Sequence, residues 1–315
     1  MPEPFVSVII CTFNRHQYLD QCLKSIKMQN YQNYEIIVVN GPSTDDTEEV
    51  LKKFNDIIVI HQDFLPGISA ARNRGISVAR GDIIAFIDDD ATADQRWLRS
   101  LVDSYQDPSI GGVGGVVYEP VKKTVQFQNG TINKSGISFA VRSPDSPLKR
   151  SQFPICIGTN CSFRKEILLL AGGFDPYFRY HLDESDLCVR IVQAGFAIRF
   201  QKAAIVIHYS AEGQNRISPD NLNSYEIYKN VIFFILKNFK GDLRSYTIRP
   251  YYALCWWGSY FLVSWSIHKK ISLIQLIRIY VQGIRGAVQG YRDGFNKRKP
   301  QKRENFQAPK SEILL

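Results

Sequence analysis

Apolar, strand-like runs alternate with helix-like segments over about the first 90 residues, and this alternation constrains the fold more than any other feature. The runs are rich in β-branched residues, which is typical of strands buried on both faces. They cover residues 5–11, 35–39, 57–61 and 82–87. Between them, an apolar stripe predicts a helix over 19–26, and residues 68–79 predict another that Gly81 ends. The pattern predicts βαβ units: an α/β fold with a mostly parallel central sheet flanked by helices.

The middle of the chain is mixed. Residues 111–115 hold four glycines but do not fit a dinucleotide-binding fingerprint, because Val117 stands where its third glycine belongs. We therefore expect a strand or a bend there. Short helices are expected over 164–171 and 187–194, followed by one or two strands over 197–207.

Past this region the sequence becomes apolar and aromatic. A helix is expected over 222–239, and residues 251–267 carry no charge and include three tryptophans. This stretch is short for a membrane-spanning helix, which needs about 20 residues, but Trp and Tyr are typical of the membrane interface. Residues 271–291 follow as an amphipathic segment with arginines every seven residues. The chain ends in a basic and polar tail over 296–315, expected to be disordered.

Charge is distributed unevenly. The 315 residues include 39 Lys and Arg against 30 Asp and Glu, a net charge of +9. Residues 237–315 carry 15 basic and 4 acidic side chains, a net of +11, whereas residues 1–236 carry a net of −2. The basicity therefore belongs to the last quarter, where it favours attachment to an anionic membrane surface. The alternative is a helical subdomain that packs on the rest of the chain or on a second subunit, as in a homodimer. No nucleic-acid partner is expected.

The six cysteines form no Cys-x-x-Cys pair and no cluster with zinc spacing. Reduced thiols in a cytoplasmic compartment are expected, and the start of the chain does not have the pattern of a signal peptide. Together with the basic C-terminal region, this predicts a cytoplasmic protein, peripheral or monotopic on the inner face of the cell membrane.

Polar side chains follow several predicted strands. They are Thr12, Asn14 and Arg15 after the first strand, Asn40 and Asp45 after the second, Asp88, Asp89 and Asp90 after the fourth, and His208 after a late strand. Ligands of open α/β sheets bind at the carboxyl ends of the strands, so we expect these groups to meet on one rim.

Three consecutive carboxylates repel one another unless a cation compensates them. Alternation along an extended segment places Asp88 and Asp90 on the same side, where they could hold a hard divalent cation. Asp89 would point elsewhere and could bind a ribose hydroxyl. The alternative is a solvated acidic turn.

Seven ordered motifs in residues 5–210 resemble family 2 glycosyltransferases. They are 7–15, 38–47, 71–75, 86–90, 158–160, 172–175 and 183–190. The resemblance implies the GT-A fold, a nucleotide-diphosphate-sugar donor, Mg²⁺ or Mn²⁺, and inversion at the anomeric carbon. It also implies a catalytic domain over 1–215, with a nucleotide-sugar half over 1–110 and an acceptor half over 111–215. The remaining 216–295 would be the helical, membrane-associating region.

The resemblance also implies roles for single residues. Nucleotide-sugar contacts are expected from Thr12, Asn14, Arg15, Asn40, Asp45, Arg72, Asn73, Asp88 and Asp89. Asn40 stands where the family usually has Asp, which leaves the donor base open, although a UDP- or dTDP-sugar is expected. Asp90 would be the main metal ligand with Asp88. His208 would be a further ligand or an ordinary half-buried histidine. Gly158 and Asn160 would lie on the acceptor side.

An acceptor hydroxyl needs a carboxylate to take its proton. Aligned through Asp186, Glu184 falls where the family places its catalytic acid, so Glu184 is the expected base and Asp183 the second choice. The alternative is that both acidic residues stabilise the start of a helix. Asp186 is expected to be structural and to pair with Arg190, four residues on.

The motif of processive polysaccharide synthases is absent after residue 190. The resemblance therefore favours transfer of one sugar to a glycan or lipid-linked acceptor in cell-surface polysaccharide or glycolipid assembly. Two alternatives remain: a sugar-1-phosphate nucleotidyltransferase, and a non-catalytic protein that binds through its basic C-terminus.

Overall fold

The computed structural model describes residues 3–65, 67–120, 123–140, 152–210, 224–239, 241–268 and 273–296. The expected tail lies outside these residues, apart from Asn296. A nine-stranded sheet forms the centre, in the order β3-β2-β1-β4-β11-β6-β12-β5, with β7 paired to β6. A second sheet has the order β10-β8-β9.

The strands have the following bounds. They are β1 Val6–Thr12, β2 Tyr34–Asn40, β3 Ile58–His61, β4 Ile83–Ile87, β5 Ala91–Ala93, β6 Ile110–Glu119, β7 Thr124–Phe127, β8 Gly130–Asn133, β9 Ser138–Ala140, β10 Gln152–Ile155, β11 Asn160–Arg164 and β12 Ala197–His208. The helices are α1 His16–Lys27, α2 Thr47–Leu51, α3 Ile68–Val78, α4 Trp97–Asp103, α5 Lys165–Leu170, α6 Asp183–Gln193, α7 Ser224–Asn238, α8 Ile248–His268 and α9 Leu273–Asn296. Ser104–Gln106 and Leu243–Ser245 form short 3-10 turns.

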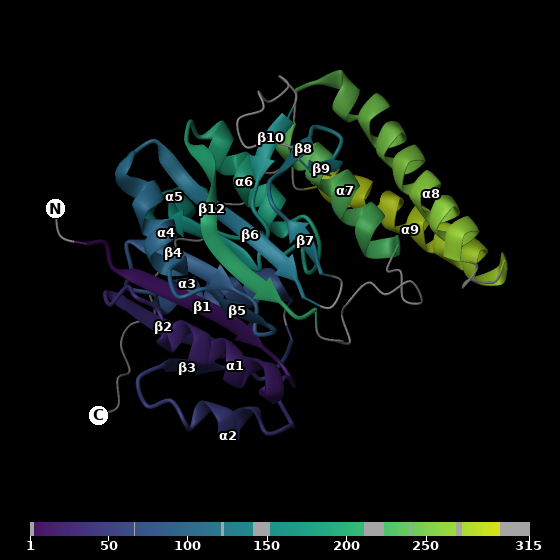
Figure 1. Ribbon diagram of the computed structural model, residues 1–315. Helices are drawn as coiled ribbons and strands as arrows, with labels where there is room; N and C mark the ends of the chain where they lie inside the picture. The colour runs from purple at the N-terminus through teal and green to yellow at the C-terminus, as the bar shows by residue number, and fades with distance from the viewer. Residues whose placement is uncertain are drawn as a thin grey trace.

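The parallel pairing predicted for the first half is confirmed, since β1 runs parallel to β2 and β4, and β2 parallel to β3. Alternate residues of β1 enter two different core clusters, with Ile9 in one and Val8 and Ile10 in the other. Helix α1 packs on the second cluster and α3 on the first, so both faces of the sheet are covered (Figure 1). The sheet as a whole is mixed, because β11 runs antiparallel between β4 and β6.

Two predicted elements differ in extent. The glycine run lies inside β6, where a Cβ at Gly112 would press on the ring of Phe163, so glycine lets neighbouring layers approach. Helix α6 begins at Asp183 instead of residue 187 and therefore carries the acidic pair in its first turn.

The C-terminal helices pack on this α/β unit. Buried side chains of α7, such as Phe233 and Phe234, belong to the same core cluster as Phe86 of β4. The ring of Phe233 stacks on Tyr177, with centroids 3.7 Å apart. Figure 1 shows α8 and α9 at one end of the molecule, away from β1–β3. Within the described residues, no helix combines the length and apolarity that a membrane span requires.

Candidate active site

The loops after β1 and β2 hold one another at the rim of the sheet. Asn14 has a left-handed backbone with φ 50°, and its side-chain oxygen accepts a hydrogen bond from Thr44 N at 2.7 Å. The backbone N–H of Asn14 donates to Ser43 Oγ at 3.0 Å. Asp45 accepts hydrogen bonds from Thr47 and from both the backbone and the ring of His16. These contacts join the loop after β1 to the loop after β2.

Asn40 and Asp45 therefore have loop-shaping contacts of their own. Asn40 is buried, and its amide donates to Glu48 Oε1 at 2.6 Å and accepts from Ser43 Oγ at 2.7 Å. Burial would raise the pKa of Asp45, but the hydrogen bonds from Thr47 and His16 outweigh it and lower this pKa to about 2.

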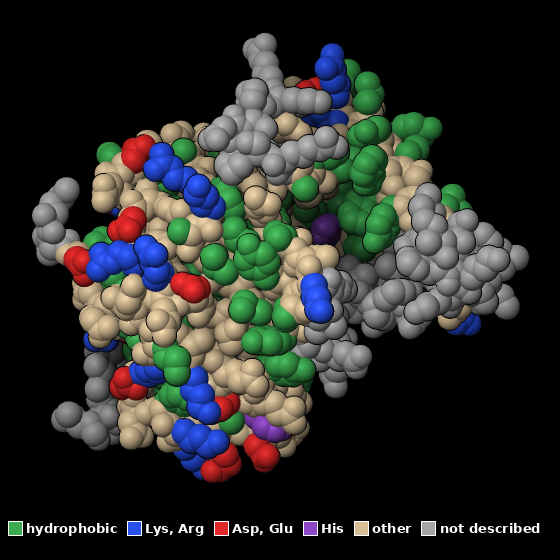
Figure 2. All heavy atoms as spheres, in the orientation of Figure 1, with side chains coloured by type: hydrophobic (Ala, Val, Ile, Leu, Met, Phe, Trp, Pro, Cys, Tyr) green, Lys and Arg blue, Asp and Glu red, His purple; other side chains and the backbone are tan. Residues whose placement is uncertain are grey.

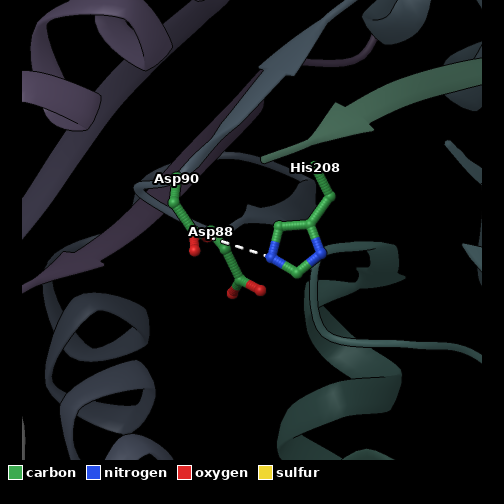
Figure 3. A group of neighbouring side chains, drawn as sticks. All are labelled: Asp88, Asp90 and His208. Carbon is green, nitrogen blue, oxygen red and sulfur yellow. Dashed lines mark hydrogen bonds and ion pairs between the residues drawn. The ribbon is translucent and has the colours of Figure 1, made fainter. Parts of the chain in front are cut away.

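Asp88, Asp90 and His208 lie together as predicted. Each offers a ligand atom within 4.8 Å of the others, and Figure 3 shows the carboxylates and the imidazole facing one another. His208 Nε2 lies 3.1 Å from Asp90 Oδ1, and the other ring nitrogen lies 2.7 Å from the Oε1 of Gln126. His208 thus turns Nδ1 toward Gln126 and Nε2 toward the cluster.

Asp89 points to different partners. It accepts from Thr12 Oγ1 at 2.8 Å and pairs with Arg15 Nη1 at 2.9 Å. The same Arg15 nitrogen lies 3.2 Å from Asp90 Oδ2. Burial and the neighbouring Asp90 raise the pKa of Asp89 to about 6, against the opposing effects of Arg15 and Thr12. Arg15 thus offsets part of the charge of Asp89 and Asp90, and Thr12 holds Asp89 in place.

Arg72 joins the cluster to the acidic pair of α6. It is buried, and its Nη1 lies 2.6 Å from Asp183 Oδ2 and 2.8 Å from Glu184 Oε1. Its Nη2 lies 3.8 Å from Asp88 Oδ1. The guanidinium also lies over the ring of Phe174, 5.1 Å from its centroid. These contacts rule out an exposed surface charge and give Arg72 carboxylate partners within the protein.

The pKa values of the two acids shift in opposite directions. Burial, then the charge of Glu184, raises the pKa of Asp183 well above its usual range. Burial also disfavours ionised Glu184, but Arg72 and hydrogen bonds from Asp183 and Arg72 lower the pKa of Glu184. The Glu184 side chain is 18% exposed and that of Asp183 only 4%, so Glu184 is the ionised and reachable member.

Residues 158–160 lie beside Asp88, Arg72 and Glu184. A Cβ at Gly158 would overlap both Glu184 Oε1 and Arg72 Nη2, so a larger residue there would displace the ends of these two side chains. Thr159, which sequence reasoning did not single out, donates to Asp88 Oδ2 at 2.6 Å.

Two predicted binding residues have structural contacts instead. Asn160 is fully buried, accepts from Trp97 Nε1 and donates to the carbonyls of Val116 and Ala204. This side chain has no polar group left for an acceptor. Asn73 donates to the Phe174 carbonyl at 2.7 Å and accepts from its amide at 3.0 Å, which fixes the turn after Gly173.

The predicted structural role of Asp186 is confirmed. Asp186 Oδ2 pairs with Arg190 at 2.7 Å and with Lys237 of α7 at 2.8 Å. Burial is outweighed by these cations, which lower the pKa of Asp186. The carboxylate anchors α6 to α7.

Comparison with known proteins agrees with this architecture. The fold and the site define a glycosyltransferase with the GT-A fold. The model of the family described as Glycosyl transferase family 2 matches residues 7–169, and the chain belongs to this family. Membership makes the chain a glycosyltransferase and gives no support to a sugar-1-phosphate nucleotidyltransferase or a non-catalytic binding protein.

Two relatives come from Haloferax volcanii. A glucosyl-dolichyl phosphate glucuronosyltransferase is 30% identical over 220 residues, which is 64% of this chain and 68% of the relative. Glycosyltransferase AglE is 36% identical over 217 residues, 65% and 67% of the two chains.

Solved structures show the same fold at lower identity. A mannosyltransferase from Pyrobaculum calidifontis, in complex with GDP-Man and Mn²⁺, has a TM-score of 0.58 at 18% identity and covers 92% of this chain and 88% of its own. TarS from S. aureus in complex with UDP-GlcNAc has a TM-score of 0.56 at 17% identity, with 90% and 81% covered.

Proposed function

We propose that this glycosyltransferase moves one sugar from a nucleotide-diphosphate-sugar to a hydroxyl of a lipid-linked glycan acceptor, with inversion at the anomeric carbon. The observation that supports it most is the position of Arg72, which lies between the Asp88–Asp90–His208 cluster and the ionised Glu184. A donor diphosphate at the cluster and an acceptor hydroxyl at Glu184 would then face one another across a single reaction centre.

The cluster has the chemistry of a site for Mg²⁺ or Mn²⁺. Two carboxylates and one imidazole are suitable ligands for such ions, and Thr159 and Gln126 orient two of the three. A bound ion would offset the negative charge that develops on the leaving diphosphate. Asp88, Asp90 and His208 would hold it.

Glu184 is the proposed base. The acceptor hydroxyl oxygen forms the new bond to the anomeric carbon while the bond to the diphosphate breaks and its electron pair leaves with the diphosphate. The hydroxyl proton moves to Glu184. Arg72 bonds both Asp183 and Glu184, so it orients the Glu184 carboxylate, and its positive charge favours the ionised form of Glu184.

The comparisons support the proposed substrate classes. The first relative carries dolichyl phosphate in its name, which supports a lipid-linked acceptor. The structural neighbours bind GDP-Man and UDP-GlcNAc, which supports a nucleotide-sugar donor without selecting its base. The UDP- or dTDP-sugar expected from the sequence stays a prediction, as does the division into residues 1–215 and 216–295.

The experiment is a panel of nucleotide-sugars with Mn²⁺, read by thermal shift and by release of nucleoside diphosphate. One donor should stabilise the protein only with the ion. Asp90→Asn should lose this ion-dependent shift, whereas Asp103→Asn, at an exposed carboxylate of α4, should keep it. An Asp90→Asn enzyme that keeps the shift and the turnover would reject the metal assignment.

A further inference from the structure

Helix α9 is fixed to α7 through a face of glycines. Gly283, Gly286, Gly290 and Gly294 are buried, and a Cβ at Gly286 would overlap the carbonyl oxygen of Tyr225. At the other glycines of this face a Cβ would meet side chains or backbone of α7 within 3 Å. The backbones therefore lie in close contact, and the helix cannot rotate without losing that fit.

This fixed orientation leaves an apolar stripe on the outside of α9. Large apolar residues recur every three, four or seven positions and are between 39% and 64% exposed. They are Ile277, Val281, Ile284, Val288 and Phe295. Side chains at these spacings share one helix face, so the stripe is continuous. At its end, Phe295 also stacks on Tyr246 and Tyr291.

A row of arginines borders the stripe. Arg278, Arg285 and Arg292 are all exposed and lie seven residues apart, which is two helical turns. The acidic residue in the described part of α9 is Asp293, which accepts from Tyr177 and Gln289. An apolar stripe beside a cationic row is typical of helices that lie in the interface of a bilayer.

Helix α8 extends this surface. Its exposed large residues include Ile248, Tyr251, Tyr252, Tyr260 and Leu262, whereas Trp256 contacts the ring of Phe139 in β9. Tyr280 of α9 donates to the carbonyl of Gly258 at 2.7 Å. Figure 1 shows the two helices side by side, and Figure 2 shows apolar side chains gathered at this end of the molecule, across a hollow from the α/β unit. Tyr and Trp favour the headgroup level of membranes.

We propose that the outer face of α8 and α9 docks on an anionic bilayer, with α9 in the plane of the interface. Charge selects this occupant, because the exposed Arg278, Arg285 and Arg292 border the apolar stripe and would face anionic headgroups. A second copy of the chain is disfavoured, since a two-fold contact through the same face would bring the arginine rows together. The proposal concerns where the protein binds and does not depend on the proposed reaction.

Docking would bring the acceptor side of the site close to the lipid surface. The ring of Trp257 in α8 contacts that of His181 edge to face, with centroids 5.7 Å apart. His181 lies three residues before Glu184, and Asn230 of α7 donates to its carbonyl. His181 therefore connects the segment that carries Glu184 to helix α8.

The test is flotation of the full chain with vesicles of phosphatidylcholine alone or mixed with phosphatidylglycerol. Binding should need the anionic lipid and weaken at high salt. Arg278→Gln with Arg285→Gln should lower the partition coefficient about fivefold per residue. Ile284→Glu with Val288→Glu should abolish binding. Leu169→Glu with Leu170→Glu, at exposed residues of α5, should bind like the wild type.

Circular dichroism and thermal unfolding check that each variant is folded. If the double glutamate variant unfolds, Ile277→Gln replaces it, because it removes apolar area from the stripe without adding charge. Wild-type protein that does not float with anionic vesicles would overturn the proposal, as would folded stripe variants that bind normally. A dimer that Ile284→Glu dissociates in the absence of lipid would assign the face to a second copy instead. Donor turnover, measured separately, bears on the proposed reaction alone.

Discussion

Arg72 Nη1 donates a hydrogen bond to Glu184 Oε1 across 2.8 Å, although the two residues are 112 positions apart in the sequence. Arg72 comes from α3, under the nucleotide-side loops, and Glu184 from the first turn of α6. One buried guanidinium therefore ties the two halves of the α/β unit together where the proposed chemistry occurs.

Replacing Arg72 by Met should lower the free energy of unfolding by about 3–5 kcal/mol, because a buried ion pair loses its cation and carboxyls are left behind. Urea unfolding followed by circular dichroism measures the change. Lys52→Met, which breaks an exposed pair with Glu49, is the control and should unfold like the wild type. Equal stability of both variants would show that the Arg72 pairs contribute nothing.

The pH profile of transfer should show an acid limb set by Glu184. Its pKa is lowered in the protein, so activity should persist at mildly acidic pH and fall only as the pH drops through that lowered pKa. Loss of the cation in Arg72→Gln should move this limb to higher pH. In Asp183→Asn, the amide can still donate to Glu184, so turnover should fall by about tenfold or less. An acid limb that is unmoved by Arg72→Gln would contradict this electrostatic role.

Gly158→Ala should reduce turnover by about 100-fold, since the new methyl group would displace Glu184 and Arg72 from their positions. Gly258→Ala is the matched control, because the nearest atom to a Cβ there lies 3.6 Å away, at an ordinary contact distance. Steady-state kinetics with saturating donor gives the comparison. Normal turnover in the Gly158 variant would mean that residue 158 does not fix the positions of Glu184 and Arg72.

The strand ends explain why part of the site could be predicted. The carboxyl ends of β1, β2 and β4 meet at one edge, and residues that follow strands are expected at that edge. Asp88, Asp90 and His208 were predicted there for this reason, and the structure brings them together. The two-faced burial of the early strands follows from their apolar composition in the same way.

Partners close in sequence could be predicted, as for Asp186 and Arg190, but partners far apart in sequence could not. Asn73 and Asn160 lie in recognisable motifs, but sequence shows the type of a side chain and not its direction, and both bind main-chain groups. No sequence pattern pointed to Gln126 as a site residue, because it is the pairing of β7 with β6 that brings it beside His208. Thr159 lies in the recognised motif 158–160, but the resemblance pointed to its neighbours Gly158 and Asn160 as acceptor-side residues.

Gln126→Ala should weaken binding of Mn²⁺ by about 10–100-fold, because Gln126 orients the imidazole of His208. Titration of Mn²⁺ by electron paramagnetic resonance in the absence of donor measures the affinity. Gln193→Ala, whose amide contacts the Asn238 carbonyl in α7, should bind the ion like the wild type. Unchanged affinity in the Gln126 variant would leave His208 without a role in the cluster.

Asp45 should stabilise the protein in a pH-dependent way. Its pKa is about 2 in the folded protein against an ordinary value of 3.8, so its contribution is present above that ordinary value and is lost as the pH falls towards 2. Asp45→Asn should cost on the order of 1–2 kcal/mol at neutral pH, and the difference from wild type should shrink in acid. Denaturant unfolding at both pH values measures it. A difference that grows in acid would have the wrong sign.

Donor binding and turnover of Glu184→Gln, measured side by side, test the central proposal most directly. The variant keeps the size of the side chain and loses its basicity. It should keep the Mn²⁺-dependent thermal shift with the donor that the wild type uses, because the cluster is intact, while transfer to the acceptor falls by a factor of at least about 100. Transfer within a few-fold of the wild-type rate would contradict the assignment of Glu184 as the base.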